Sequence, residues 1–280
     1  MDVRNKISIL HLYYDLMNLY GDWANVELMV RALQMRGQEV ILHRKSLGDE
    51  ISFAEYDIIY IGSGTERSLL ACLPDINARK ESLLKCIEDE VFVLATGNSH
   101  EIFGKAVTDA SGNRHEALGL LDFETVQGDA RITGDCVCEA DFIQEKLIGF
   151  INRASIGQSG NVARPFVFLL SQGADDKSDK EGIRYKNLLG TYMTGPILVR
   201  NPPLIKYFTD KVMERSSTIQ NVSVHQEPNI KHADFARGDK QEVENAYITE
   251  DSGSDLFFAH QEKAYQKALA ELSARIDRRS

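Results

Sequence analysis

The stretch Val91-Phe-Val-Leu-Ala-Thr-Gly-Asn-Ser-His-Glu-Ile-Phe-Gly104 decides how the fold is interpreted. Its first five residues form an apolar run without polar alternation, which is typical of a strand buried on both faces of a sheet. A tight turn and a short helix follow directly, which is the layout of a nucleophile elbow. Such a turn presents one side chain at the carboxyl end of the sheet, where open α/β sheets place their sites. The helix N-terminus favours negative charge at that point.

Strands and helices alternate through the residues before this stretch. Three further apolar runs predict strands, and two stretches with apolar residues at helical spacing predict helices. The strands are Lys6–Tyr13, Glu39–His43 and Tyr56–Gly62, and the helices are Asn25–Gln38 and Asp75–Glu90. This β-α-β-α-β order implies an α/β fold with a mostly parallel sheet and helices on both faces.

The sequence changes character after Leu118. Short strands separated by glycine and aspartate turns are expected to complete the sheet or to form a smaller antiparallel layer. They are Arg131–Cys138, Leu147–Ile151 and Pro165–Leu170, followed by a polar loop at Ser171–Gly182 and a return to the core at Tyr185–Ile197. Pro202 then opens a helix that runs to about Arg215.

We divide the chain of 280 residues into three parts. Residues 1–215 form the α/β domain, and residues 216–255 form a polar connector that is extended or partly disordered. Residues 256–280 carry a C-terminal helix, which either docks on the domain or engages a partner.

The charge of the chain limits its partners. Lys and Arg number 32 against 42 Asp and Glu, so the formal net charge is -10. A net negative protein argues against general binding to nucleic acid or anionic membranes. No stretch approaches the length of a membrane span and no export signal is visible, so a cytoplasmic location with reduced thiols is expected.

Six collinear blocks, spread over residues 7–212, carry a family resemblance. They are Asp15–Asp22 with Asn25, Asp57–Arg67, Leu118–Glu124, Arg131–Asp135, Gly149–Phe150 with Asn152, and Lys180–Pro196. Together they resemble class I glutamine amidotransferases of the cobyric acid synthase (CobB/CobQ) type. Within that family they are most similar to the amidotransferase subunits of lipid II isoglutaminyl synthase, which amidates D-glutamate in peptidoglycan precursors. The resemblance implies a flavodoxin-like fold.

The resemblance also implies a chemistry that this chain lacks. In the family a cysteine at the elbow attacks the amide of glutamine, a histidine serves as base and acid, and ammonia leaves for a synthetase partner. Gly97 stands at the cysteine position and Thr194 at the histidine position. Glycine has no side chain, and a threonine hydroxyl is no base near neutral pH. The resemblance therefore predicts a catalytically degenerate member.

Other family positions are kept. The resemblance places an oxyanion-type loop at Gly62, Ser63 and Gly64 with Asn98 beside it, a supporting acid at Asp22, and an arginine for the substrate carboxylate at Arg131. Structural roles compete with each of these: a turn for the glycines, a helix cap for Asp22, and an exposed edge strand for Arg131.

The remaining reactive side chains favour structural roles. Ser99 and His100 are adjacent at a helix start and point in different directions, so we interpret Ser99, together with Asn98, as an N-cap. Cys136 and Cys138 share one face of a strand and are expected in the core, as are two helical cysteines, Cys72 and Cys86. The irregular spacing of His225, His232 and His260 disfavours a metal site. No phosphate-binding loop and no cofactor motif is found.

Three functions stay open at this point. The leading hypothesis is a non-hydrolysing homologue that binds a Mur-ligase-like synthetase as a heterodimer. The second is an active amidotransferase or hydrolase with another nucleophile, such as Ser99. The third is a sensor that holds glutamine or another small carboxylate at the elbow.

Overall fold

Two six-stranded sheets organise the chain in a computed structural model that describes residues 6–160, 166–172, 180–224 and 254–276. The strands of the first sheet are β1 (Lys6–Leu12), β2 (Glu39–Lys45), β3 (Ile58–Ile61), β4 (Phe92–Thr96), β11 (Ile183–Tyr185) and β12 (Leu188–Thr191). They run in the order β11-β12-β4-β3-β1-β2, and only β11 is antiparallel to its neighbour. The predicted mostly parallel sheet is confirmed.

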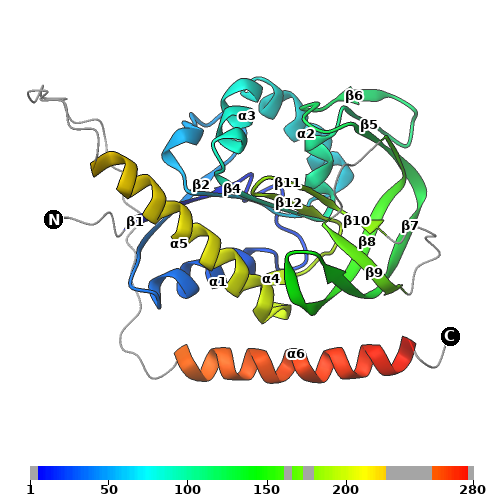
Figure 1. Cartoon of the computed structure of the whole chain (residues 1–280). Coiled ribbons are helices and arrows are strands. Elements are labelled where there is room, and N and C mark those ends of the chain that lie inside the picture. The colour runs from blue at the N-terminus through cyan, green and yellow to red at the C-terminus, as the bar shows by residue number, and fades with distance from the viewer. Residues whose placement is uncertain (1–5, 161–165, 173–179, 225–253, 277–280) are drawn as a thin grey trace, which may run out of the picture.

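Helices cover both faces of this sheet (Figure 1). One face carries α1 (Trp23–Gln34), α4 (Ile197–Arg200) and α5 (Pro202–Val224), and the other carries α2 (Glu66–Asn77) and α3 (Lys80–Glu88). Alternate residues of each strand therefore enter two different cores: Ile7 and Ile9 face α1, whereas Leu10 and Leu12 face α2 and α3. Burial on both faces explains why these strands lack polar alternation. A 3₁₀ turn, η1 (Phe53–Glu55), precedes β3.

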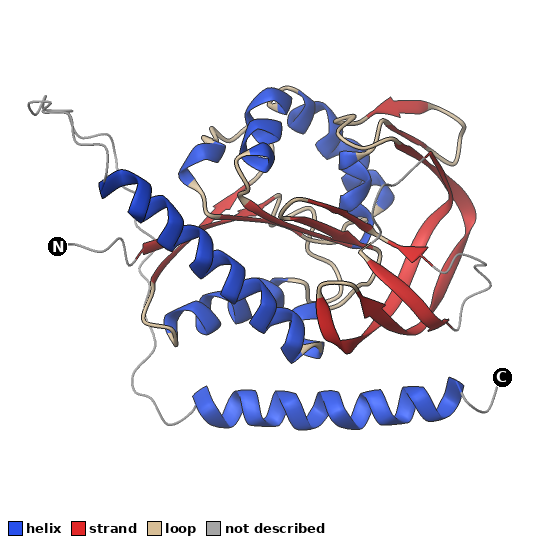
Figure 2. Cartoon of the chain, in the orientation of Figure 1, coloured by secondary structure: helices blue, strands red, loops and turns tan. Residues whose placement is uncertain are grey.

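The second sheet stands beside the first and is built around one long strand (Figure 2). Its strands are β5 (Ala106–Thr108), β6 (Arg114–Glu116), β7 (Phe123–Ala140), β8 (Ile143–Gly160), β9 (Val167–Gln172) and β10 (Lys180–Glu181). β7 pairs antiparallel with β8 and β9 and parallel with β5. Of the two alternatives for this region, a separate layer is the correct one.

The C-terminal helix docks on this second sheet. α6 (Ser254–Ile276) buries Tyr265 against Val137 and Ile148, and the Tyr265 hydroxyl donates a hydrogen bond of 2.5 Å to the carbonyl oxygen of Lys146. The alternative in which this helix packs on its own domain is therefore the one observed. None of the helices in the described ranges is long and apolar enough to cross a membrane.

Two boundaries differ from the prediction. The single helix expected over Asp75–Glu90 is wrong: α2 begins at Glu66, ends at Asn77, and is followed by a separate α3. Helix α5 continues through Val224, past the expected end near Arg215. Most of the connector predicted at 216–255, and most of the polar loop at 171–182, lie outside the described residues. The division into three parts stays a prediction.

Candidate functional site

The turn after β4 has the backbone of a nucleophile elbow. Gly97 follows Thr96 directly, has a φ of +62°, and starts the short 3₁₀ helix η2 (Gly97–Phe103). A positive φ is costly for residues with a side chain, by about 1–2 kcal/mol, because Cβ crowds the following carbonyl. Glycine adopts it freely, so the elbow is retained here without any group to present.

The side chain of Ser63 occupies the space above Gly97. Ser63 follows β3, the strand beside β4, and is only 3% exposed. A Cβ atom placed on Gly97 would lie 2.5 Å from the Ser63 Cβ and would overlap its Oγ. Real Cβ atoms do not approach other heavy atoms so closely, so a side chain at residue 97 and the present side chain at residue 63 exclude each other.

The backbone N–H groups of the turn after β3 are already paired. Ser63 N–H donates to Asp22 Oδ2 at 2.6 Å, and Gly64 N–H donates to Asn98 Oδ1 at 3.0 Å. Side chains at Gly62 and Gly64 would meet Met17, whose carbonyl carbon lies 3.3 Å from a Cβ at Gly62 and whose Cε lies 3.0 Å from one at Gly64. The glycines therefore serve close packing, and their assignment to an oxyanion loop stays a prediction.

Asp22 lies under this turn and is fully buried. It precedes α1, yet its side chain makes no capping bond; besides Ser63 N–H it accepts from Thr96 Oγ1 at 3.0 Å. Thr96 in turn contacts the Tyr60 hydroxyl at 2.9 Å, which receives the Asn25 amide at 2.9 Å. Burial raises the pKa of Asp22 from 3.8 to about 7, against the opposing effect of these hydrogen bonds. Its role as the supporting acid stays a prediction.

The strand register brings Thr194 to the same edge as Gly97. Thr191 of β12 pairs with Thr96 of β4, and both chains continue past the carboxyl end of the sheet. The N–H and the hydroxyl of Thr194 both donate to the carbonyl oxygen of Phe150, at 2.8 and 3.2 Å. The two positions where the family resemblance expects reactive groups thus lie at the same edge of the sheet and hold no titrating side chain.

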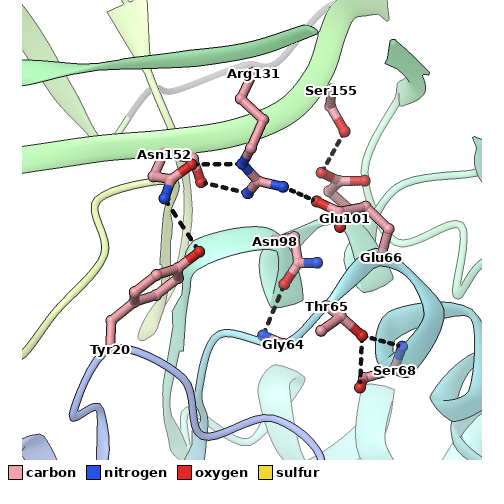
Figure 3. Close-up of polar contacts among 10 residues, drawn as sticks. All are labelled: Tyr20, Gly64, Thr65, Glu66, Ser68, Asn98, Glu101, Arg131, Asn152 and Ser155. Atoms are coloured by element: carbon pink, nitrogen blue, oxygen red, sulfur yellow. Dashed lines mark hydrogen bonds and ion pairs between the residues drawn. The ribbon is translucent and has the colours of Figure 1, made fainter. Parts of the chain in front are cut away.

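Arg131 bridges the second sheet and α2. Its guanidinium donates to Glu66 Oε1 at 2.7 Å and to Asn152 Oδ1 at 2.6 Å, and Asn152 receives further support from its own bond to the Tyr20 hydroxyl at 3.1 Å (Figure 3). The guanidinium is therefore already paired with a carboxylate of this chain. Glu66 was missed as a site residue, and its position in the first turn of α2, preceded by Thr65 as N-cap, was the available signal.

Ser99 and His100 do not interact as nucleophile and base. The Ser99 hydroxyl shares its hydrogen between the carbonyl oxygens of Ile61 and Thr96, at 2.9 and 2.8 Å. His100 Nδ1 lies 2.8 Å from the carbonyl oxygen of Gly97, and burial lowers the His100 pKa to about 4. Neither Asn98 nor Ser99 caps η2, because Thr96 precedes it without a side-chain cap.

A buried carboxylate next to the elbow escaped the sequence analysis. Glu101 of η2 is 1% exposed and accepts hydrogen bonds from Ser155 Oγ at 2.6 Å and Thr125 Oγ1 at 2.8 Å. Burial raises the pKa of Glu101. Its partners come from β8 and β7, more than twenty residues away, so spacing along the sequence gives no hint of them.

The cysteines are buried free thiols, as expected: Cys72, Cys86, Cys136 and Cys138. Within the described ranges no group of three or more histidine, cysteine or acidic side chains has the arrangement of a metal site. His225 and His232 lie outside the described residues.

Comparison with known proteins matches residues 8–202 to the family of CobB/CobQ-like glutamine amidotransferase domains. The GatD subunit of lipid II isoglutaminyl synthase (glutamine-hydrolyzing) from Staphylococcus aureus is 33% identical over 216 residues, covering 75% of this chain and 86% of that protein. The same subunit from Streptococcus pneumoniae is 32% identical over 203 residues, covering 71% and 77%. A solved structure of PurLQS from Thermotoga maritima is 15% identical over 77% of this chain and 99% of that chain, with a TM-score of 0.45, too low to carry an argument.

Proposed function

The chain belongs to the CobB/CobQ-like glutamine amidotransferase family and is a homologue of the GatD subunit, and from that premise we propose that it does not hydrolyse glutamine. It acts instead in the cytoplasm as a binding or scaffolding subunit for a Mur-ligase-like synthetase, in a heterodimer that serves cell-wall precursor modification. Both curated relatives are subunits of a glutamine-hydrolyzing synthase, so the proposal separates the family's fold from the family's chemistry.

The observation that carries the proposal is that the Ser63 side chain occupies the space which a side chain at residue 97 would need. Thioester formation needs a nucleophile that emerges from the elbow, a nearby proton acceptor, and N–H groups free to receive the developing oxyanion. Here the elbow carries Gly97, and Ser63 fills the space of its missing side chain. The position of the acceptor holds Thr194, whose hydroxyl donates to a carbonyl.

The groups that the family resemblance expects to bind substrate are also paired with side chains of this chain. Asp22 and Asn98 accept the N–H groups of Ser63 and Gly64, so these donors would have to leave partners before they could bind an oxyanion. The Arg131 guanidinium holds Glu66, a carboxylate of the same chain, where the family resemblance expects the carboxylate of a substrate. These contacts favour the binding subunit over a glutamine sensor at the elbow.

A hydrolase centred on Ser99 receives little support. Its hydroxyl hydrogen is directed at backbone carbonyls, and the adjacent His100 is turned to the Gly97 carbonyl. A nucleophile needs its base within hydrogen-bond reach. The subunit role draws on the names of both curated relatives, each of which is a subunit of a synthase.

The test is a glutaminase assay on the purified full chain, alone and mixed with a Mur-ligase-like synthetase from the same organism. We expect no release of glutamate or ammonia above buffer, while a relative with an intact cysteine, assayed in parallel, is active. Release that disappears in Ser99→Ala, or a covalent adduct of diazo-oxonorleucine mapped to any residue, contradicts the proposal. Failure of the chain to co-purify with the synthetase contradicts the scaffolding role alone.

A further inference from the structure

A cavity lies at the carboxyl end of β1 and β2, on the side of the sheet that α1 covers. Its volume is about 150 Å³, and it is enclosed by the end of the sheet, the segment that follows β1, and the first turns of α1. Its polar and aromatic lining residues are His11, Tyr14, Asn18, Trp23, Glu27 and Arg44. One water takes about 30 Å³ of liquid volume, so the cavity is the size of a small organic molecule.

Two of the lining residues carry a buried polar atom without a hydrogen-bond partner. His11 is 3% exposed and its Nε2 has none among the described residues, and the same holds for Oδ1 of Asn18. Such buried polar atoms are normally satisfied by protein, water or ligand, because an unmade hydrogen bond costs about 1–3 kcal/mol. Burial and the nearby Arg44 lower the His11 pKa to about 4, so its ring is neutral near pH 7.

The rim of the cavity carries one charge of each sign. Arg44 pairs with His11 in the register of β1 and β2, so both side chains stand on the α1 face of the sheet. Its Nη2 is 3.8 Å from Glu27 Oε1, and both side chains are about half exposed, at 46% and 48%. This distance is too long for a direct hydrogen bond, so both groups retain capacity for a ligand.

Two aromatic side chains form the walls. Trp23 and Glu27 are one helical turn apart on α1, and Trp23 is 55% exposed. Tyr14 is 38% exposed and meets the His11 ring edge-on, with 6.3 Å between centroids. Exposed aromatic faces beside a charged pair are suited to an ammonium group.

We propose that this cavity binds a small zwitterionic amino acid with a polar side chain. Arg44 takes the carboxylate, Glu27 and the Trp23 face take the ammonium, and the polar side chain reaches His11 Nε2 and Asn18 Oδ1. The charged groups at the rim and the unpartnered neutral polar atoms of the lining residues match the two ends of such a molecule. None of the lining residues makes a hydrogen bond described at the elbow, so the proposal does not rest on the proposed function.

The test measures binding of L-serine, L-asparagine and L-glutamine to the full chain by isothermal titration calorimetry. The methyl ester and the N-acetyl derivative of each serve as probes that lack one charge. We expect saturable binding of at least one amino acid and weaker binding of both derivatives. Arg44→Met and Trp23→Ala should each weaken binding, Arg44→Met at least about tenfold, because a hydrogen bond between charged groups is lost.

Arg67→Met is the matched control, since Arg67 is exposed on α2 outside the cavity. It should leave the affinity unchanged, and melting curves establish that each variant is folded. Absence of saturable binding for all three amino acids overturns the proposal, as does affinity that survives Arg44→Met. Binding that is lost in Arg131→Met but kept in Arg44→Met places the ligand at the elbow and also overturns it. A crystal structure with only ordered waters at His11 Nε2, grown with the amino acid, has the same consequence.

Discussion

Introducing a cysteine at the elbow by Gly97→Cys should destabilise the chain strongly when Ser63 is present and mildly when Ser63 is replaced by glycine. Two costs combine in the single variant. The positive φ at residue 97 contributes about 1–2 kcal/mol, and the overlap of the new Cβ with Ser63 contributes about 1–3 kcal/mol as overpacking. The loss in free energy of unfolding is therefore about 2–5 kcal/mol.

In the background Ser63→Gly the overlap with the side chain is gone, the Cα of residue 63 stays 3.1 Å from the new Cβ, and the backbone cost of about 1–2 kcal/mol remains. The double-mutant cycle of wild type, Ser63→Gly, Gly97→Cys and the double variant should thus give a coupling energy of about 1–3 kcal/mol. Urea unfolding followed by circular dichroism measures all four stabilities. Ser63→Gly keeps the N–H that donates to Asp22, so the turn retains its main contact.

Additive effects, within about 0.5 kcal/mol, would refute the argument that Ser63 occupies the nucleophile's space. A second readout is the reaction of the new thiol with a disulfide reagent, which should be slow in the single variant and faster in the double variant. Glutaminase activity is expected in neither, because residue 194 still supplies no base. Glutaminase activity in the double variant would show that the catalytic histidine of the family, replaced here by Thr194, is dispensable.

Three other changes test contacts described above. Asp22→Asn removes a titrating group. The pKa of Asp22 in the folded state, about 7, lies above the ordinary 3.8, so the stability that its protonated carboxyl gives the wild type is full below pH 4 and is lost as the pH rises to 7. Relative to wild type, the variant should gain on the order of 1 kcal/mol in free energy of unfolding per pH unit across that window, measured by urea unfolding. Tyr265→Phe removes the bond to Lys146 and should cost about 1 kcal/mol while speeding proteolysis of α6. Arg131→Met breaks the partly exposed ion pair with Glu66. It should change the free energy of unfolding, measured by urea unfolding, by less than about 1 kcal/mol, because exposed ion pairs contribute little.

The buried strands could be predicted from sequence because residues covered on both faces must all be apolar. The apolar run Val91–Ala95 differs from strand β4 by one residue at each end, and the run Tyr56–Gly62 contains strand β3. The start of helix α2 was placed too late, at Asp75, because Pro74 lies inside the apolar stripe that Leu69, Cys72, Leu73 and Ile76 form. Its capping residue Thr65 was the signal to use.

The second sheet and the state of the site needed coordinates. β7 and β8 are each 18 residues long, but register shifts interrupt their alternation, so the sequence suggests shorter strands. Ser63 and Gly97 are 34 positions apart, so the sequence places a glycine at the elbow without indicating which side chain occupies the space above it. The same applies to Glu66 and Arg131, whose pairing spans 65 positions.

The segment from Tyr13 to Asp22 borders both the proposed amino-acid cavity and the elbow. Asn18 lines the cavity beside β1, while the Met17 carbonyl packs on Gly62 and Asp22 holds the Ser63 N–H. A molecule that binds at the cavity or at the elbow and shifts this segment must also break the contacts that the segment makes at the other place. By thermodynamic linkage this coupling is reciprocal: a ligand in the cavity and a protein bound at the elbow edge would change each other's affinity by the same factor.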